Sequence, residues 1–198
     1  MYLDNDSIDQ LSANKNFIFN LTDYLVFRHI HEGRGDNIAL FFCDRVFTYS
    51  ELAKYIAKTI GFLYEYDIKE GDRVILLLED SPAFVILFFS LLALGAIVIP
   101  INPVAHEELD SIFSSVDPSL IFTQNSFDFK SESTSVSKYT DLVIALSDIT
   151  SDSLGGLEQL ITTSDLVDII PKTRGSSIAF CLCSSGTTGR PKIIPHRH

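Results

Sequence analysis

The stretch that decides the fold is GDRVILLLEDSPAFVILFFSLLALGAIVIP, residues 71–100. It begins with turn residues at Gly71-Asp72. Val74–Leu78 follows as a run without a polar residue, which is typical of a strand buried on both faces of a parallel sheet. A second apolar block begins at Ala83 and contains no charged residue as far as Ile101. If the second block is one long helix, the chain is a membrane protein. If it is a shorter helix and a strand, it belongs to a globular core.

Two interpretations of the second block are open. Its length allows a membrane-spanning helix. Against that, Ser81 is a good helix N-cap, Pro82 suits the first helical position, and Gly95 is a typical helix stop. Ala96–Ile99 then predicts a buried strand that ends at the next proline. Divided in this way, the block is a helix of about three turns followed by a strand.

The remaining pattern alternates strands and helices around this unit. Thr48 and Glu51 form a capping box that predicts a helix start, with Leu52, Tyr55, Ile56, Thr59 and Leu63 on one face. The other helices that we expect cover residues 22–31 and 104–116, and residues 154–169 are irregular with some helical character. The other expected strands cover residues 38–43, 46–47, 120–123, 142–146 and 177–183. Residues 126–140 are expected to form a polar surface loop. This order predicts an α/β fold with a largely parallel sheet, whose ligands sit at the carboxyl ends of the strands.

Composition narrows the class of protein. The 198 residues suffice for one domain with a real core, and 46% of them are hydrophobic, which excludes wholesale disorder. The three cysteines fit a reducing compartment, and residues 1–10 lack the pattern of a secretory signal, so we expect a cytoplasmic protein.

The charge is unevenly distributed along the chain. The formal net charge is −11, yet the residues after Asp168 carry a net +5. The acidic remainder argues against nucleic-acid binding, and the basic end indicates an anionic ligand, unless it is only a solubilising tail.

Residues 184–198 are expected to form a loop that leaves the last strand. The candidate phosphate-binding residues in it are Ser184, Ser185, Gly186, Thr187, Thr188, Gly189 and Lys192. Glycines allow the backbone close to a ligand, successive N–H groups form an anion-binding nest, and the lysine adds a mobile positive charge. The spacing is not that of a Walker A loop, because Lys192 comes three residues after Gly189. By turn chemistry alone the segment could equally be an ordinary loop.

The same residues resemble a known signature. Ser184-Ser185-Gly186-Thr187-Thr188-Gly189-Arg190-Pro191-Lys192 is similar to the phosphate-binding motif of the adenylate-forming enzymes, which include acyl- and aryl-CoA ligases, adenylation domains and luciferases. Residues 47–52 and 92–102 look like the first and second core motifs of that family, and residues 71–74 and 79–82 look like the strand and turn between them. The resemblance covers residues 23–198. It implies the N-terminal subdomain of such an enzyme over residues 21–198, with residues 1–20 as an extension, and no membrane span.

The resemblance implies a reaction in two steps. A carboxylate attacks the α-phosphate of ATP to give an acyl-adenylate and pyrophosphate, and a thiol of CoA or of a carrier phosphopantetheine then takes the acyl group. The signature loop would hold the β- and γ-phosphates with the help of Mg²⁺. Ile193, where many members have glycine, and Gly33-Arg34-Gly35-Asp36, which looks like a stretch of benzoate-type CoA ligases, favour an aromatic or small acid.

Several parts of such an enzyme are not in this sequence. Family members are more than twice as long, and their later motifs have no counterpart here, so we expect the chain to work with the remainder of a ligase, or with a carrier protein, and to be silent by itself. No residue is predicted to be catalytic. A zinc site at Cys181, Cys183, His196 and His198 does not fit a standard spacing; the cysteines are expected to share a buried strand face and the histidines to be solvated. The alternative function is a stand-alone, non-catalytic nucleotide-binding or scaffold module.

Overall fold

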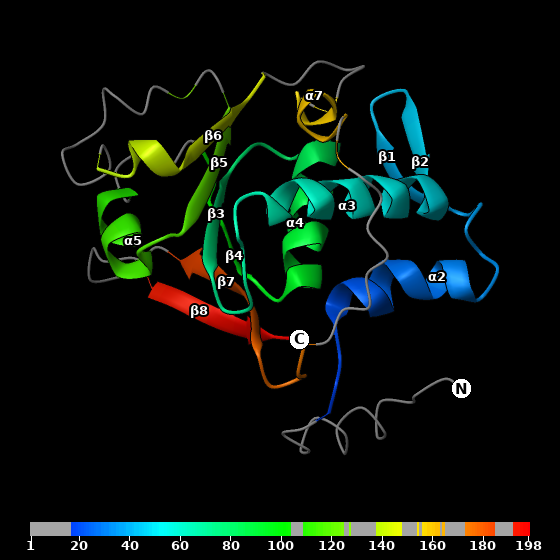
Figure 1. The fold of residues 1–198 in the computed structure, drawn as a ribbon, viewed down its shortest axis with the longest axis horizontal. Coiled ribbons are helices and arrows are strands. Elements are labelled where there is room, and N and C mark those ends of the chain that lie inside the picture. The colour runs from blue at the N-terminus through cyan, green and yellow to red at the C-terminus, as the bar shows by residue number, and fades with distance from the viewer. Residues whose placement is uncertain are drawn as a thin grey trace.

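A six-stranded sheet with helices on both faces forms the centre of the molecule (Figure 1). The computed structural model describes residues 17–103, 109–124, 127, 138–147, 154, 156–162, 164, 173–184 and 192–198. The sheet has the order β6-β5-β3-β4-β7-β8. Its strands are β3 (Arg73–Leu77), β4 (Ile97–Pro100), β5 (Leu120–Gln124), β6 (Val143–Leu146), β7 (Ile178–Ser184) and β8 (Lys192–Arg197). All neighbouring pairs are parallel except β7 with β8, which confirms the expected α/β class.

The unit β3–α4–β4 follows the signals in the sequence. Helix α4 (Pro82–Leu94) begins where the Ser81 hydroxyl accepts a hydrogen bond from the Phe84 N–H at 3.2 Å. It ends at Gly95, whose φ of 78° is the left-handed conformation that glycine adopts without steric cost. The helix has 13 residues, and no helix in the described part of the chain is long and apolar enough to cross a membrane. The membrane-span interpretation of this block is therefore wrong.

Helix α3 (Tyr49–Tyr64) packs beside α4 on one face of the sheet. Its capping box is present, because the Thr48 hydroxyl accepts from the Glu51 N–H at 3.2 Å and the Glu51 carboxylate accepts from the Thr48 N–H at 2.8 Å. The predicted inner face is buried at four of its five positions. Tyr55 is the exception: it is half-buried, and its hydroxyl donates to Glu158 of α7 (Leu157–Ile161) at 3.1 Å.

Two hydrophobic clusters lie on the two faces of the sheet. The larger contains the inner faces of α3, α4 and α7, and the smaller contains α5 (Leu109–Val116) with the opposite faces of β3 and β5. The predicted apolar positions Leu109, Ile112, Phe113 and Val116 are all buried. The earlier part of that expected helix, residues 104–108, lies outside the described residues. So does most of the expected loop 126–140, which ends in a short 3-10 turn, η3 (Thr140–Leu142).

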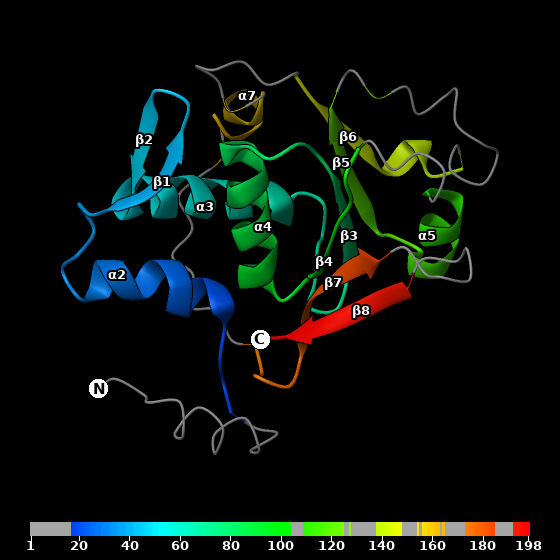
Figure 2. The same cartoon turned by 180° about the vertical axis from the view of Figure 1, so that it is seen from behind.

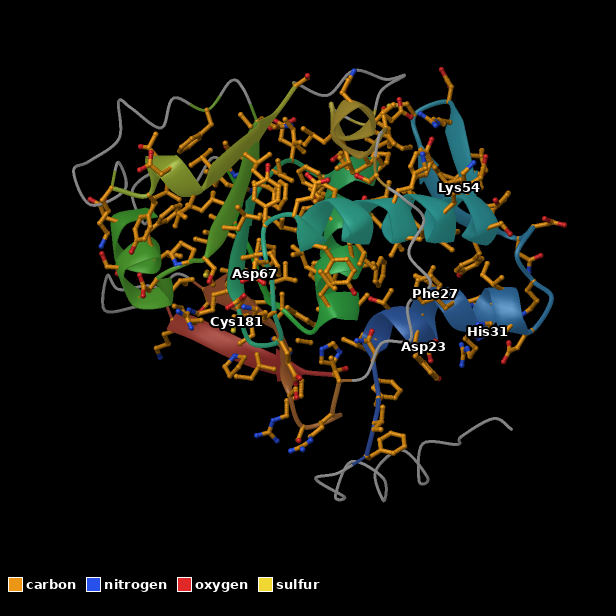
Figure 3. All side chains as sticks on the ribbon, in the orientation of Figure 1. Asp23, Phe27, His31, Lys54, Asp67 and Cys181 are labelled. Carbon is orange, nitrogen blue, oxygen red and sulfur yellow. The ribbon has the colours of Figure 1, made fainter. Side chains whose placement is uncertain are left out.

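The first part of the chain forms a smaller layer against α3. The helix expected over residues 22–31 is confirmed as η1 (Asp23–Phe27), which has π-type hydrogen bonding, followed by α2 (Arg28–His31). Figure 3 labels Asp23, Phe27 and His31 along this helix. A separate two-stranded sheet follows, with β1 (Ile38–Phe42) antiparallel to β2 (Arg45–Thr48), as the sequence predicted.

One sequence expectation about the last fifteen residues is wrong. They are not all loop, because Lys192–Arg197 forms β8, which pairs antiparallel with β7. Pro195 is unusual in a strand, because proline has no backbone N–H to donate to a neighbouring strand. β8 lies at the edge of the sheet, where a missing N–H on the outer side leaves no partner strand unsatisfied (Figure 2).

Candidate functional site

The candidate phosphate-binding segment lies between β7 and β8. Ser184, the last residue of β7, and Lys192, the first of β8, are partners in the antiparallel register. The two flanks of the segment are thus held side by side by the hairpin. The predicted contacts Ser185, Gly186, Thr187, Thr188 and Gly189 lie outside the described residues. Ser184, the residue before them, ends β7, and β7 runs parallel to β4, so Ser184 lies at the carboxyl edge of the sheet.

Lys192 is available to bind an anion. Its side chain is exposed, and among the described residues no carboxylate lies within ion-pair distance of it. A lysine that has no internal partner and is placed at the carboxyl end of a parallel strand can neutralise a phosphate that approaches this edge. Ser184 is partly buried beside it and can add a hydroxyl donor.

The inner face of the hairpin is fixed by packing. Cys181, labelled in Figure 3, is buried in the smaller hydrophobic cluster. Cys183 is half-buried and packs against the same cluster, as expected for residues two apart on a strand. Burial raises the pKa of the Cys181 thiol. In the part of the chain that the structure describes, no three side chains come together in a way that could hold a metal ion.

The two histidines of the hairpin are only partly exposed and each has a partner in the fold, which corrects the expectation that they are solvated. His196 stacks on Phe180 across the two strands, with ring centroids 4.7 Å apart and an interplanar angle of 9°. His198 accepts a hydrogen bond at Nδ1 from the Leu21 N–H, at 3.2 Å. Burial lowers the pKa of His198 to about 4, and the nearby charge of Glu70 opposes that shift. Both rings therefore brace β8 against its neighbours.

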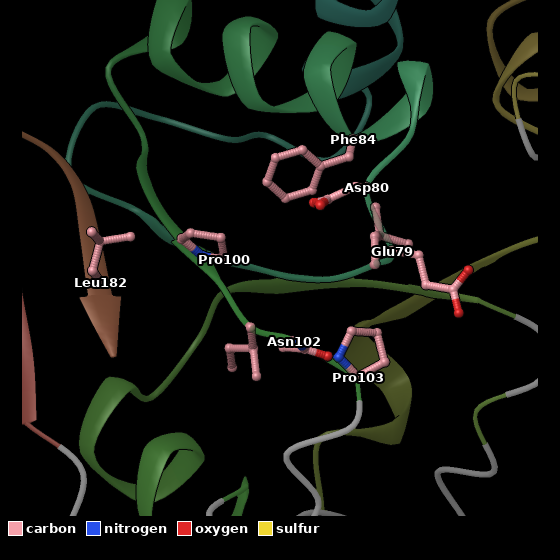
Figure 4. Close-up of a pocket in the computed structure, with 9 residues that line it drawn as sticks. Glu79, Asp80, Phe84, Pro100, Asn102, Pro103 and Leu182 are labelled. Carbon is pink, nitrogen blue, oxygen red and sulfur yellow. The ribbon is translucent and has the colours of Figure 1, made fainter. Parts of the chain in front are cut away.

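A cavity of about 370 Å³ opens at the same edge of the sheet (Figure 4). It is lined by the ends of three strands and the start of α4: Leu78, Glu79, Asp80, Phe84, Pro100, Ile101, Asn102, Pro103 and Leu182. In Figure 4 the Asp80 carboxylate lies beside the Phe84 ring. The carboxylates of Glu79 and Asp80 make this cavity unfavourable for a triphosphate.

Sequence reasoning missed this cavity and β8. The cavity is lined by residues 78–84, by residues 100–103, about 20 positions later, and by Leu182, about 100 positions later. No local pattern in the sequence therefore predicts it. β8 had one signal, the apolar pair Ile193-Ile194 directly after the signature lysine, but Pro195 and the basic charge favoured a loop.

Comparisons with known proteins agree with this geometry. A family model described as AMP-binding enzyme matches residues 27–198. Among curated proteins, the 3-hydroxybenzoate/4-hydroxybenzoate–CoA ligase of Thauera aromatica is 24% identical over 90% of this chain and 35% of its own length. The crotonobetaine/carnitine–CoA ligase of Salmonella agona is 31% identical over 83% of this chain and 34% of its own length. The chain thus spans about a third of the length of these relatives.

Solved structures share the fold. The anthranilate CoA ligase AuaEII, in complex with anthranoyl-AMP, superposes with a TM-score of 0.75 at 21% identity, over 94% of this chain and 36% of that one. The N-terminal subdomain of Klebsiella oxytoca NpsA, in complex with 3-hydroxybenzoyl-AMSN, gives a TM-score of 0.69 at 22% identity, over 90% and 41%.

Proposed function

The chain belongs to the AMP-binding enzyme family, and on that premise we propose that it is the phosphate-binding, N-terminal part of an ATP-dependent ligase that joins a carboxylic acid to a thiol. The observation that carries this proposal is the Ser184–Lys192 pair, which holds the two flanks of the signature segment together at the carboxyl edge of a parallel sheet. The predicted contacts to the β- and γ-phosphates remain Ser184, Ser185, Gly186, Thr187, Thr188, Gly189 and Lys192.

The chemistry asked of these residues is binding and charge stabilisation. In the proposed reaction a carboxylate oxygen attacks the α-phosphorus of ATP, and pyrophosphate leaves with the electrons of the broken P–O bond. Lys192 and the backbone N–H groups of the signature segment would hold the phosphates that depart, and so stabilise the negative charge that grows on them. This step needs no general base, because the attacking carboxylate is already ionised at neutral pH.

Mg²⁺, when bound, would neutralise part of the phosphate charge. The described residues offer no cluster of metal ligands, so we expect the ion to arrive with the nucleotide. The thiol acceptor is proposed to be CoA, as in the names of the curated relatives, with a carrier phosphopantetheine as the second possibility. The acid substrate is proposed to be aromatic, as hydroxybenzoate in one relative's name, or a small aliphatic acid, as crotonobetaine in another's. We place the ligase in the cytoplasm, where its three free cysteines would stay reduced.

The remaining parts of the ligase would complete the site. An apolar pair on the outer face of the hairpin supports this: Leu182 and Ile194 are cross-strand partners and are 44% and 45% exposed. Such a pair is expected where another part of a protein packs. We therefore expect the 198-residue chain by itself to show no acid-dependent exchange of pyrophosphate into ATP.

Calorimetric titration with MgATP tests the proposal. We expect the chain to bind MgATP weakly and Lys192→Ala to weaken that binding about tenfold, since a charge-assisted contact to phosphate contributes about 1.5–3 kcal/mol. Lys69→Ala is the matched control, because Lys69 is also exposed, is paired with Asp67, and precedes β3 at the opposite edge of the sheet. Equal affinity of both variants would assign the binding to another surface. A folded chain that binds no MgATP would favour the non-catalytic module.

A further inference from the structure

Residues 17–22, which we name the clasp, are tied to the segment that leads into β7. The Phe19 N–H donates to the Thr173 carbonyl at 2.9 Å, and the Gly175 N–H donates to the Phe17 carbonyl at 2.8 Å. An antiparallel bridge joins Ile18 to the same segment. The start of the clasp is therefore paired with the residues immediately before β7 through one isolated β-bridge and its flanking hydrogen bonds, although the two segments are more than 150 residues apart in the sequence.

Buried side chains reinforce this contact. The Asn20 amide donates to the Leu92 carbonyl at 2.7 Å and to the Thr173 hydroxyl at 3.0 Å, and the Thr173 hydroxyl donates to the Phe19 carbonyl at 2.6 Å. The Asn20 and Thr173 side chains are 2% and 3% exposed. Buried polar groups are retained only where their hydrogen bonds are made, so this network fixes one arrangement of the clasp, the last turn of α4 and the entrance to β7.

The clasp also reaches the other strand of the hairpin. The Leu21 N–H donates to His198 Nδ1, directly after β8, and the His198 N–H donates to the Ser177 carbonyl, directly before β7, at 3.1 Å. The base of the β7–β8 hairpin is thus held on both of its strands. Ser184 and Lys192, which flank the candidate phosphate-binding segment in the sequence, are paired at the other end of the same hairpin, its tip.

The hairpin also packs on the sheet. β7 pairs in parallel with β4, with Val98 opposite Phe180, and Cys181, Cys183 and Ile193 contact the smaller hydrophobic cluster. The clasp adds a second attachment to the hairpin, at its base.

Thr173 is tightly packed against the end of α4, at that second attachment. A Cβ atom at Gly95 would lie 2.9 Å from Thr173 Cγ2, which is closer than such atoms approach in proteins. The end of α4 and the entrance to β7 are thus in direct contact, and a shift of one moves the other.

We propose that the clasp positions Ser184 and Lys192, the two described residues that flank the signature segment, with Asn20 and Thr173 as positioning residues that act through the β7–β8 hairpin and touch no substrate. This inference rests on the proposed function only in taking ATP as the ligand. The contacts of the clasp do not depend on that function. It also extends the nucleotide-binding domain to include residues 17–20, which the sequence assigned to an extension.

Hydrogen exchange and MgATP titration of matched variants test the proposal. Thr173→Val removes the hydroxyl and keeps the shape, and Thr173→Ser keeps the hydroxyl. Thr59→Val is the control, because Thr59 is fully buried in α3 and its hydroxyl bonds only to the Tyr55 carbonyl of the same helix. We expect Thr173→Val, and neither of the other two, to accelerate amide exchange at the hairpin tip, residues 182–184 and 192–194, about tenfold, the factor for one ordinary hydrogen bond.

The outcomes separate the two proposals. Thr173→Val and Thr59→Val are compared at equal stability in denaturant. If amide exchange at the hairpin tip is then equal in both, the clasp has no positioning role. If the wild-type chain binds MgATP, Thr173→Val should also weaken that affinity and Thr173→Ser should restore it; unchanged affinity overturns the inference. If the wild-type chain binds no MgATP, the proposed function fails while tip exchange still decides the role of the clasp. Should Thr173→Val not fold, Asn20→Ala, which keeps the Thr173–Phe19 bond, is measured in the same way.

Discussion

His198 Nδ1 accepts a hydrogen bond from the backbone N–H of Leu21, across 177 positions of the sequence. The bond requires that Nδ1 carry no proton, so the neutral imidazole is the form that holds the clasp to the hairpin. His198 Nε2 is buried and has no hydrogen-bond partner among the described residues. A charged imidazolium at this place would lose one hydrogen bond and gain none.

The first prediction concerns the pH dependence of stability. Burial lowers the pKa of His198 to about 4, whereas that of an unfolded histidine is about 6.5. Between these values the unfolded chain binds more protons, so this contribution to stability is complete above pH ~6.5 and is lost as the pH falls toward ~4. We expect the free energy of unfolding in urea to rise with pH between pH 5 and 7, where carboxylates titrate little, and this slope to be smaller in His198→Gln. Part of the slope should remain, because burial and the charge of Arg34 lower the pKa of His29 as well. His31→Gln, at an exposed histidine, should keep the wild-type slope.

The second prediction concerns the stop of α4. Gly95 and Gly71 both have left-handed backbones, with φ of 78° and 86°, but a Cβ would meet Thr173 at the first and open space at the second. Gly71→Ala should cost only the conformational term, about 1–2 kcal/mol. Gly95→Ala should cost at least about 1 kcal/mol more, because the crowded side chain must displace Thr173 or Glu70. Equal midpoints in urea for the two variants would show that the contact at Gly95 relaxes freely.

The third prediction concerns the start of α3. Thr48→Ala removes the hydroxyl of the capping box and should cost about 1 kcal/mol. Ser115→Ala, which removes an exposed hydroxyl bonded within α5, should stay within about 0.5 kcal/mol. Hydrogen bonds from the backbone and side chain of Thr48 hold the pKa of Glu51 below its usual value. This part of the stability is present above the unfolded pKa of Glu51 and is lost as the pH falls through the folded one, so Thr48→Ala should flatten the acid limb of the stability profile.

The fourth prediction orders the cysteines by reactivity. Cys43 is exposed in the turn between β1 and β2, whereas Cys181 is buried and burial raises the pKa of its thiol. Thiolate is the reactive form, so in the native chain an aromatic disulfide reagent should label Cys43 in a fast phase and Cys181 in a slow one. Cys43→Ser should remove the fast phase. A fast phase that instead disappears in Cys181→Ser would show that β7 opens readily.

The sequence predicted the features whose causes are local. Ser81 with Pro82 and Thr48 with Glu51 are capping signals read within one helical turn, and each is confirmed by a hydrogen bond. The apolar face of α5 follows from the spacing of its residues alone. The signature from Ser184 to Lys192 is equally local, and it led to the family that the comparisons show.

The features with distant causes were missed or misjudged. Tyr55 belongs by spacing to the apolar face of α3, yet its hydroxyl bonds to Glu158, about 100 residues away. The histidines of the hairpin were expected in solvent, because nothing near them in the sequence reveals Phe180 or Leu21 as partners.

The sequence by itself determined which segments are helices, where most of them start and stop, and which residues are suited to bind phosphate. These depend on capping, glycine conformation and hydrophobic period, all of which act over a few residues. Only the tertiary structure decided that β8 returns along β7, that Ser184 and Lys192 meet, and that Asn20 and Thr173 are joined by a hydrogen bond. Those contacts join residues from 8 to 153 positions apart, and their free energy comes from burial and hydrogen bonds that exist only when the whole sheet has formed.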